Sequence, residues 1–309
     1  MQEKDRDPIV AICLLAALAD GDRSAEEQAE FQRIAARLGG GDTSTLTMRA
    51  QQGSLTVQDA VAELGSPDLR PTAYEMATSV VYADGGANPA EARFLEELRR
   101  ALDLPEDGAK PIQTEVSSLA LAPLSAPPLD PTHSRDRALD DLIRRQALLT
   151  GALELLPQNL ASLAIIPLQM RLVYRIGAEF GHNLEPEQIK DLLGAMGIGA
   201  AAQVLDGFAR RILGGLGRGL FGRVLGGVVG GTAGLAAGAG LSFVTTYALG
   251  QAARQYYSQG RRLSREDLQA LFQRFRAEAE ALLPRMQEEI HAQSQHLDFK
   301  RLIDSVRGT

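Results

Sequence analysis

Carboxylates that recur in two matching turns are the residues of this sequence best placed to do chemistry. An Ala-Asp-Gly tripeptide carrying Asp20 returns 64 residues later with Asp84, and Glu27 and Glu91 stand at the same position behind the two turns. If the two copies pack about a pseudo-twofold axis, the four carboxylates converge. Their mutual repulsion must then be relieved by protonation or by a hard cation such as Ca²⁺ or Mg²⁺. The pattern predicts a possible divalent-cation site made of Asp20, Glu27, Asp84 and Glu91.

Local helix chemistry explains the same residues without any ligand. The glycine of each turn can take the left-handed conformation that ends a helix, and Ser24 and Asn88 can cap the next one. Glu27 and Glu91 follow these caps by three residues and complete capping boxes, while Pro89 occupies the favoured first helical position. Both interpretations, cation ligand and helix cap, stay open at this point.

Apolar stripes behind the two turns indicate which elements position these carboxylates. The stripes have the spacing i, i+3, i+7 of one helix face and consist of Phe31, Ile34 and Leu38 in the first copy and Leu95, Leu98 and Leu102 in the second. Each copy is therefore expected to be a helix, a tight turn and a second helix. We predict an all-α fold, with a helical bundle of two such pseudo-repeated units in residues 1–107.

Groupings typical of an active site are scarce. The sequence has no G-x-x-x-x-G-K-[ST] phosphate loop and no G-x-S-x-G nucleophile elbow. His291 and His296 are five residues apart, which misses the i, i+4 spacing of a helical zinc pair. The single cysteine, Cys13, lies in an apolar run, so a buried and inert thiol is expected. The protein is predicted not to be an enzyme.

The charge is divided unevenly along the chain. Residues 1–141 hold 25 acidic and 13 basic side chains, whereas residues 142–309 hold 14 and 19. An acidic front suits cations or a basic partner, and a basic, apolar rear suits anionic lipid. Nucleic acid is not expected as a partner, because aromatic stacking platforms are missing among the arginines. The first residues lack the order of a signal peptide, which predicts a cytoplasmic front domain.

Two further boundaries follow from composition and periodicity. Residues 108–135 contain Pro111, Pro123 and three more prolines, which predicts a Pro-rich linker. Residues 264–309 begin with a cap at Ser264 and continue with apolar side chains at helical spacing, which predicts an amphipathic C-terminal helix kinked at Pro284.

Between them, residues 136–263 are expected to form a Gly/Ala-rich apolar helical domain. Residues 224–253 hold no Asp, Glu, Lys, Arg or His, and this length is sufficient to cross a bilayer. Small residues recur at every fourth position from residue 222 to residue 250 and would give one helix a face for close packing: Gly222, Gly226, Gly230, Gly234 and Gly238, continued by Ser242, Thr246 and Gly250. Basic residues on both sides are candidates for lipid-phosphate contact: Arg210, Arg211, Arg218, Arg223, Arg254, Arg261 and Arg262. A buried helical core with the same small residues is the alternative.

The paired A-D-G-x5-E units, each followed by its apolar helix, resemble the tellurite-resistance TerB-like family over roughly residues 5–107. The resemblance implies a helical bundle with a metal site built from acidic residues of both units. Carried over to this sequence, the ligands would be Asp20 and Glu27 with Asp84 and Glu91. It also implies a role in tellurite or general envelope stress.

Residues from about 140 to 262 resemble the YcjF-type domain of unknown function that often follows a GTPase domain. The matching features are the Leu156-Pro157 and Ile166-Pro167 steps, the run from Gln169 to Gly177, and the Gly/Ala-rich segment that closes at Tyr256-Tyr257. The resemblance implies association with a membrane.

Together these observations predict a non-enzymatic regulatory or scaffold protein at the cytoplasmic membrane, with a possible cation site in front and a membrane-associated rear. A protein partner or a second copy of the chain is expected as well. Two alternatives remain: a soluble helical partner-binding protein that oligomerises through the glycine-rich face, and a membrane-perturbing or pore-forming protein.

Overall fold

The computed structural model of the chain describes residues 6–19, 46, 48–50, 52–83, 85–122, 124, 134–156, 160–199, 204 and 233–307. Helices are the only regular secondary structure in these ranges, so the all-α prediction is confirmed. The chain divides into two compact units. The front unit contains residues 1–121 and 200–223, and the rear unit contains residues 122–199 and 224–309.

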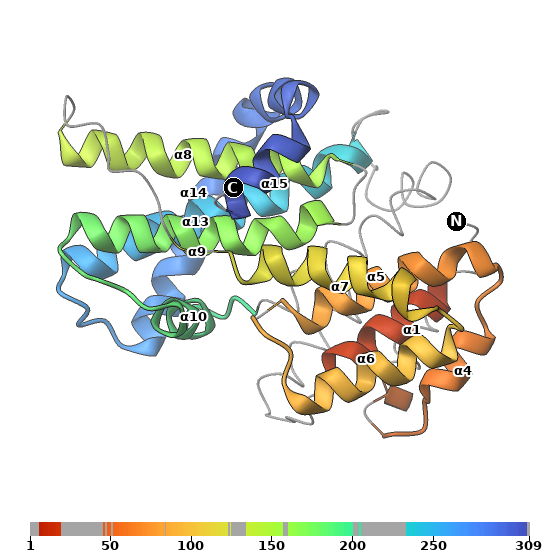
Figure 1. Cartoon of the computed structure of the whole chain (residues 1–309). Helices are drawn as coiled ribbons and strands as arrows, with labels where there is room; N and C mark the ends of the chain where they lie inside the picture. Colours follow the sequence, from red (N-terminus) through yellow and green to blue (C-terminus); the bar gives the residue numbers. More distant parts are fainter. Residues whose placement is uncertain are drawn as a thin grey trace. The chain divides into compact units, whose positions relative to one another are not determined.

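The described part of the front unit consists of short helices drawn from red to yellow in Figure 1. Their bounds are α1 Arg6–Ala17, α4 Val57–Ala62, the 3-10 turn η2 Pro67–Leu69, α5 Arg70–Val81, α6 Pro89–Ala101 and α7 Glu106–Ala120. Helix α1 packs on α5 and α4, and α6 and α7 both contact α5. The second predicted helix-turn-helix is therefore α5, a turn, and α6.

The core of the front unit comes from the apolar faces of these helices. Ile9 and Ile12 of α1 and Tyr74 of α5 are fully buried. Leu95 and Leu98 of α6 are buried with them, as the apolar stripe behind the second turn predicts. The cysteine of α1, Cys13, is buried too, as expected.

A helix, and not a linker, occupies the start of the predicted linker at residues 108–135. Helix α7 spans Glu106–Ala120 and contains Pro111. A buried stripe of Ala109, Val116 and Leu119 attaches it to the front unit, and Gln113 Nε2 donates a 2.6 Å hydrogen bond to the Tyr74 hydroxyl of α5. The linker prediction is wrong for residues 108–120. Pro111 removes one internal hydrogen bond and its ring crowds the preceding turn, but burial of the apolar stripe favours the helix.

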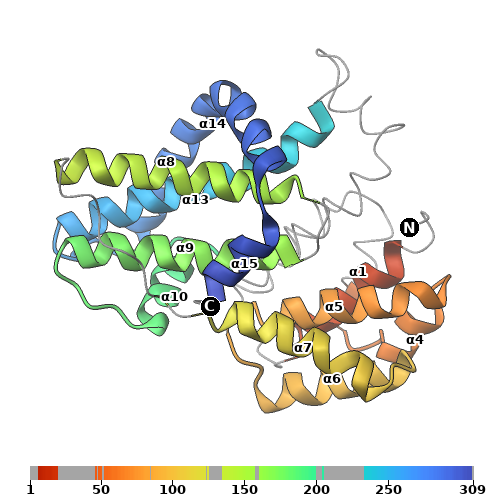
Figure 2. The ribbon, with the colours of Figure 1, turned by 45° about the horizontal axis from the view of Figure 1, so that its top comes forward.

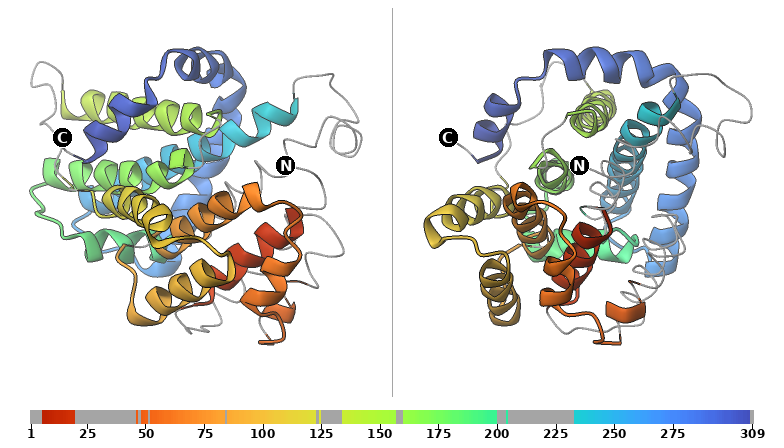
Figure 3. Two further views of the ribbon diagram at one scale, coloured as in Figure 1. Left: turned by 45° about the vertical axis from the view of Figure 1, so that its right-hand side comes forward. Right: turned by 90° about the vertical axis from the view of Figure 1, so that its right-hand side faces the viewer.

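Long helices build the rear unit (Figure 2). Their bounds are α8 Arg135–Glu154, α9 Leu160–Glu179, α10 Pro186–Ala195, α13 Ala233–Ser258, α14 Arg265–His296 and α15 Phe299–Arg307. Helix α13 contacts α8, α9 and α14, while α10 and α15 pack on α9. The right-hand view of Figure 3 looks along α8 and α9 and shows α14 running beside α13.

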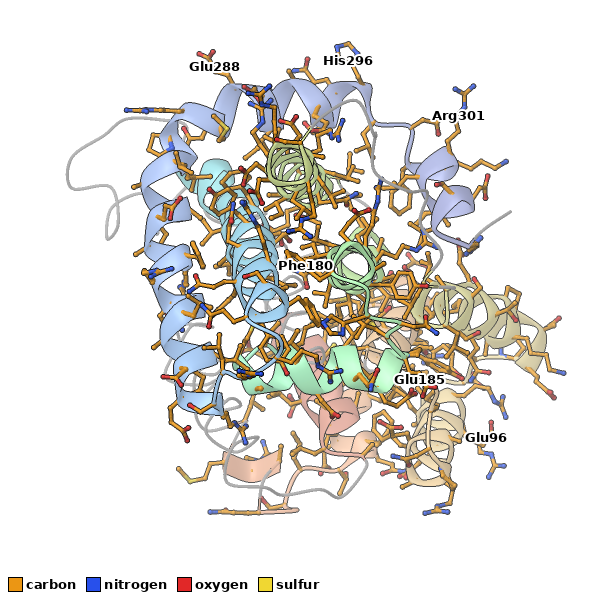
Figure 4. All side chains as sticks on the ribbon, turned by 90° about the vertical axis from the view of Figure 1, so that its left-hand side faces the viewer. Glu96, Phe180, Glu185, Glu288, His296 and Arg301 are labelled. Carbon is orange, nitrogen blue, oxygen red and sulfur yellow. The ribbon has the colours of Figure 1, made fainter. Side chains whose placement is uncertain are left out.

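The C-terminal amphipathic segment forms two helices. Ser264 caps α14 in a capping box with Asp267, and Leu268 and Phe272 are buried, as predicted. Figure 4 shows α14 turning sharply before the part that carries Glu288 and His296. Pro284 lies inside this helix, four residues before Glu288. A proline removes one backbone donor and its ring displaces the preceding turn, which explains the bend. The helix then ends at His296, and α15 follows as a separate helix.

The apolar segment at residues 224–253 lies partly outside the described residues, and α13 begins within it at Ala233. No helix in the described ranges is both long and apolar enough to cross a bilayer.

Candidate functional site

The second acidic turn forms the capping box that the sequence predicts. Gly85 has a positive φ of 135°, and α6 begins at Pro89. The Asn88 side-chain oxygen accepts hydrogen bonds from the backbone N–H groups of Ala90, at 2.8 Å, and of Glu91, at 3.1 Å. In return Glu91 Oε2 accepts a 2.7 Å bond from the Asn88 backbone N–H. The Glu91 carboxylate is thus fixed, 9% exposed, at the positive end of the α6 dipole.

The other three candidate ligands, Asp20, Glu27 and Asp84, lie outside the described residues. Within the described ranges no three His, Cys, Asp or Glu side chains gather closely enough to hold a metal ion. The cation site therefore stays a prediction, with Glu91 as its one placed member.

A surface groove of about 640 Å³ runs between α4 and α6, farther along α6 than Glu91. Four of its polar side chains bond to one another or to a neighbour on the same lining. Gln58 Nε2 donates to Glu97 Oε1 at 3.1 Å, and Arg100 Nε donates to Glu96 Oε1 at 2.8 Å. Because two basic side chains, Arg93 and Arg100, and two acidic ones, Glu96 and Glu97, line the groove, it offers no excess charge to a ligand.

Glu96 is the most strongly perturbed carboxylate along α6. Arg99 donates to both of its oxygens, and this bonding, with a further contribution from Arg100, lowers the pKa of Glu96 to about 2. Arg99 Nη1 also donates to the Leu104 carbonyl at 2.7 Å. The cluster thereby ties the C-terminal end of α6 to the residues that lead into α7.

In the rear unit the described continuation of the small-residue row packs inside the chain. Thr246 Oγ1 of α13 lies 2.9 Å from Thr150 Oγ1 of α8 and accepts a 3.0 Å bond from Gln169 Nε2 of α9. The Ser242 carbonyl lies 3.2 Å from the same Thr150 hydroxyl. Thr150, Gln169 and Thr246 have no exposed surface.

Gly250 continues this contact one turn farther along α13. A Cβ atom added there would lie 2.8 Å from two side-chain carbons of Ile143 on α8 and 3.2 Å from Leu172 on α9. Such distances are below ordinary contact, so only glycine lets the three helices approach this closely. We call the face formed by Ser242, Thr246 and Gly250 the small-residue face.

The glycines of the predicted packing row are placed only in part. Gly234 and Gly238 belong to α13, whereas Gly222, Gly226 and Gly230 lie outside the described residues.

The predicted lipid-contacting arginines are also divided. Arg210, Arg211, Arg218 and Arg223 lie outside the described residues. Arg254 pairs with Asp140 at 2.5 Å and with Asp136 at 3.2 Å, and so links α13 to α8. Arg261 and Arg262 are exposed in the turn between α13 and α14.

Two sets of hydrogen bonds in the rear unit could not be predicted from the sequence, those of Thr150 and Gln169 with α13 and those of Arg171 with α15. Thr150 and Gln169 stand out only as polar residues in an apolar stretch, and nothing local pairs them with Thr246. Arg171 donates to backbone carbonyls of α15 more than 130 residues away. Its position amid apolar neighbours was the available signal, because a cation in an apolar run needs a partner.

Comparison with known proteins finds a family similar to the N-terminal part of the front unit. Residues 6–113 match the family model described as Tellurite resistance protein TerB. This part of the chain is similar to TerB domains. No curated protein and no solved structure matches the chain. The TerB domain extends past the predicted boundary at residue 107 and into α7. The resemblance of residues 140–262 to YcjF-type domains stays a prediction.

Proposed function

We propose that this protein is a non-enzymatic regulatory or scaffold protein of the tellurite-resistance and envelope-stress response. In this proposal the TerB domain binds a divalent cation such as Ca²⁺ or Mg²⁺. The rear unit associates with the cytoplasmic membrane and takes up a protein partner or a second copy. The TerB match over residues 6–113 is the observation that carries the proposal.

The geometry at Glu91 supports the cation part. The capping box holds this carboxylate in one position before any ligand arrives, so binding needs little ordering of the side chain. Asp84 precedes it by seven residues, directly before the turn at Gly85. Carboxylate oxygens supplied from such a turn are the ligands that hard cations prefer.

The membrane part is supported by charge. Residues 142–309 carry an excess of basic side chains, and Arg261 and Arg262 are exposed between α13 and α14. Exposed arginines next to an apolar segment are suited to anionic lipid head groups.

The small-residue face favours a second candidate, a helical partner-binding protein without a membrane role. Ser242, Thr246 and Gly250 are used for packing of α13 against α8 and α9. If the glycines before them serve a similar contact within the chain or with a second copy, the uncharged segment needs no lipid.

Titration calorimetry of the full chain with Ca²⁺ and with Mg²⁺ tests the cation site. The proposal predicts saturable binding that Glu91→Gln weakens at least about tenfold, because the amide keeps the cap acceptor but loses the charge. Glu97→Gln is the matched control, since Glu97 is an exposed carboxylate on the same helix. Equal affinity in both variants, or no binding by the wild type, would remove Glu91 from the proposal.

Fractionation of native cells tests the membrane part. We expect the protein in the membrane pellet, and resistance to carbonate and high-salt washes would indicate an integral rear segment. Recovery in the soluble fraction would favour the partner-binding alternative. Loss of tellurite tolerance in a deletion strain, restored by the wild-type chain, would connect either location to the response.

A further inference from the structure

Helix α15 is attached to the rest of the rear unit through a small contact. It follows α14 after Leu297 and Asp298, and its packing partner is α9, beside which it lies in Figures 1 and 2. Ile303 and Val306 are the side chains it buries. Two buried apolar residues are a modest contact for an element next to the end of the described chain.

One arginine fastens the end of this helix. Arg171 of α9 donates through Nη1 to the Ser305 carbonyl at 3.1 Å and through Nη2 to the Val306 carbonyl. The C-terminal carbonyls of a helix carry partial negative charge, so a guanidinium there is favourable. Burial lowers the pKa of Arg171, which shows that this contact is made at the expense of hydration.

The sequence of α15 is that of an amphipathic, basic helix. Phe299, Leu302, Ile303 and Val306 have the i, i+3, i+4, i+7 spacing of one face. Lys300 and Arg301 lie off this face and are exposed. A helix of nine residues is only marginally stable alone in water, so α15 needs an apolar surface to remain helical. Helix α9 supplies one such surface, and a membrane interface would supply another.

Two arginines lie near each other on the neighbouring helices, Arg145 on α8 and Arg175 on α9. Burial lowers the pKa of Arg175, the neighbouring Arg145 guanidinium lowers it further, and Glu179 opposes these effects. Arg175 stands one helical turn beyond Arg171 on α9. An anionic surface would therefore attract both α15 and the helix that carries it.

We propose that α15 is a releasable lipid-binding helix, which packs on α9 in water and transfers its apolar face to an anionic membrane surface. The exchange keeps Ile303 and Val306 out of water throughout, and it brings Lys300 and Arg301 to lipid phosphates. Arg171 sets how readily the helix leaves α9. This inference rests on the proposed membrane association of the rear unit and names the element that contacts lipid.

A single tryptophan can report on the transfer, because the natural chain contains none. Phe299→Trp in the full chain places it on the apolar face of α15. With vesicles of phosphatidylcholine and phosphatidylglycerol at 3:1 we expect a blue shift of the emission and co-sedimentation, and neither with phosphatidylcholine alone. Each basic residue near an anionic surface contributes about 1 kcal/mol, so Lys300→Glu with Arg301→Glu should weaken binding at least about tenfold.

The variant Arg171→Lys tests whether α15 must leave α9 to bind lipid or whether a fixed basic surface is sufficient. Lysine keeps the positive charge but cannot present the planar pair of N–H donors. The proposal predicts severalfold tighter vesicle binding, whereas a fixed basic surface would bind with unchanged affinity. Far-UV circular dichroism and thermal melts of each variant establish that the rear unit is folded.

Three results would overturn the proposal: unchanged binding of the double charge reversal, unchanged or weaker binding of Arg171→Lys, or sedimentation without an emission shift. In the last case the protein binds membranes through another segment, so the proposed function would stand and this inference would fail.

Discussion

At the residue scale, the position of Glu91 depends on its reciprocal bonding with Asn88. The short distances of this capping box, 2.7 Å and 2.8 Å, fix both the start of α6 and the candidate ligand. The residue types and their spacing were sufficient to predict this box, because a cap is a local interaction. The partners of more distant contacts could not be predicted in this way. An example is Arg171 of α9, which bonds to carbonyls of α15.

Asn88→Ala should lower the free energy of unfolding of the front unit by about 1 kcal/mol, since two backbone donors lose their acceptor. Asn88→Asp should remain close to the wild type. Urea unfolding followed by labelling of Cys13, which is buried in this unit, measures the difference. An unchanged midpoint for Asn88→Ala would contradict the energetic role given to the cap.

Glu96 should make the front unit sensitive to acid. Its folded-state pKa of about 2 lies below the ordinary value of 4.5, so its contribution is present above pH 4.5 and is lost as the pH falls toward 2. Glu96→Gln should flatten this part of the pH dependence of the unfolding midpoint. An identical slope between pH 4.5 and 2 in variant and wild type would show that the Arg99 contact adds no stability.

At the element scale, α13 is the helix around which the rear unit is built. Its hydroxyl and glycine positions recur at the spacing of one helix face, and that regularity was visible in the sequence. The sequence does not show which surface packs on this face, because small-residue faces suit a second copy, a lipid-embedded neighbour or another helix of the same chain equally well. The hydrogen bonds from Thr150 of α8 and Gln169 of α9 show that Ser242 and Thr246 pack against helices of the same chain.

Gly250→Ala should destabilise the rear unit by about 1 to 3 kcal/mol, because the new methyl group meets the branched side chain of Ile143 at 2.8 Å in a packed core. Gly240→Ala is the matched control on the same helix. Its methyl group would meet mainly the far end of the Leu283 side chain, which can rotate away. Thermal melts that rank Gly240→Ala as equally or more destabilising would be inconsistent with the close contact at Gly250.

Prolines have different effects in two helices of this chain. The prolines of residues 108–135 predict a linker, but the buried stripe of α7 keeps the first part of this range helical. In α14 the sequence predicts a bend at the proline, because an amphipathic pattern continues on both sides of it, and the helix does bend. Whether a helix ends at a proline or continues past it depends on how much apolar surface it buries on both sides, and the position of the proline alone does not show this.

At the scale of the whole molecule, the chain combines a domain similar to TerB with a helical unit of different composition. The change from acidic to basic halves predicted two parts from the sequence, but the described boundary after Leu121 lies beyond the predicted end at residue 107. The cation site could be predicted only as a set of four residues, because convergence of the two turns is a property of the packed unit.

The most direct test of the central claim is the temperature at which Cys13 becomes reactive in the full chain, with and without Ca²⁺ or Mg²⁺. Burial raises the pKa of this single thiol to about 12, so alkylation at neutral pH reports opening of the front unit. A cation at about 100 times its Kd adds roughly 2.7 kcal/mol, which for a domain of this size shifts the transition by about 10 °C or more. We predict this shift in the wild type and its loss in Glu91→Gln. The same labelling temperature with and without both ions would contradict the account.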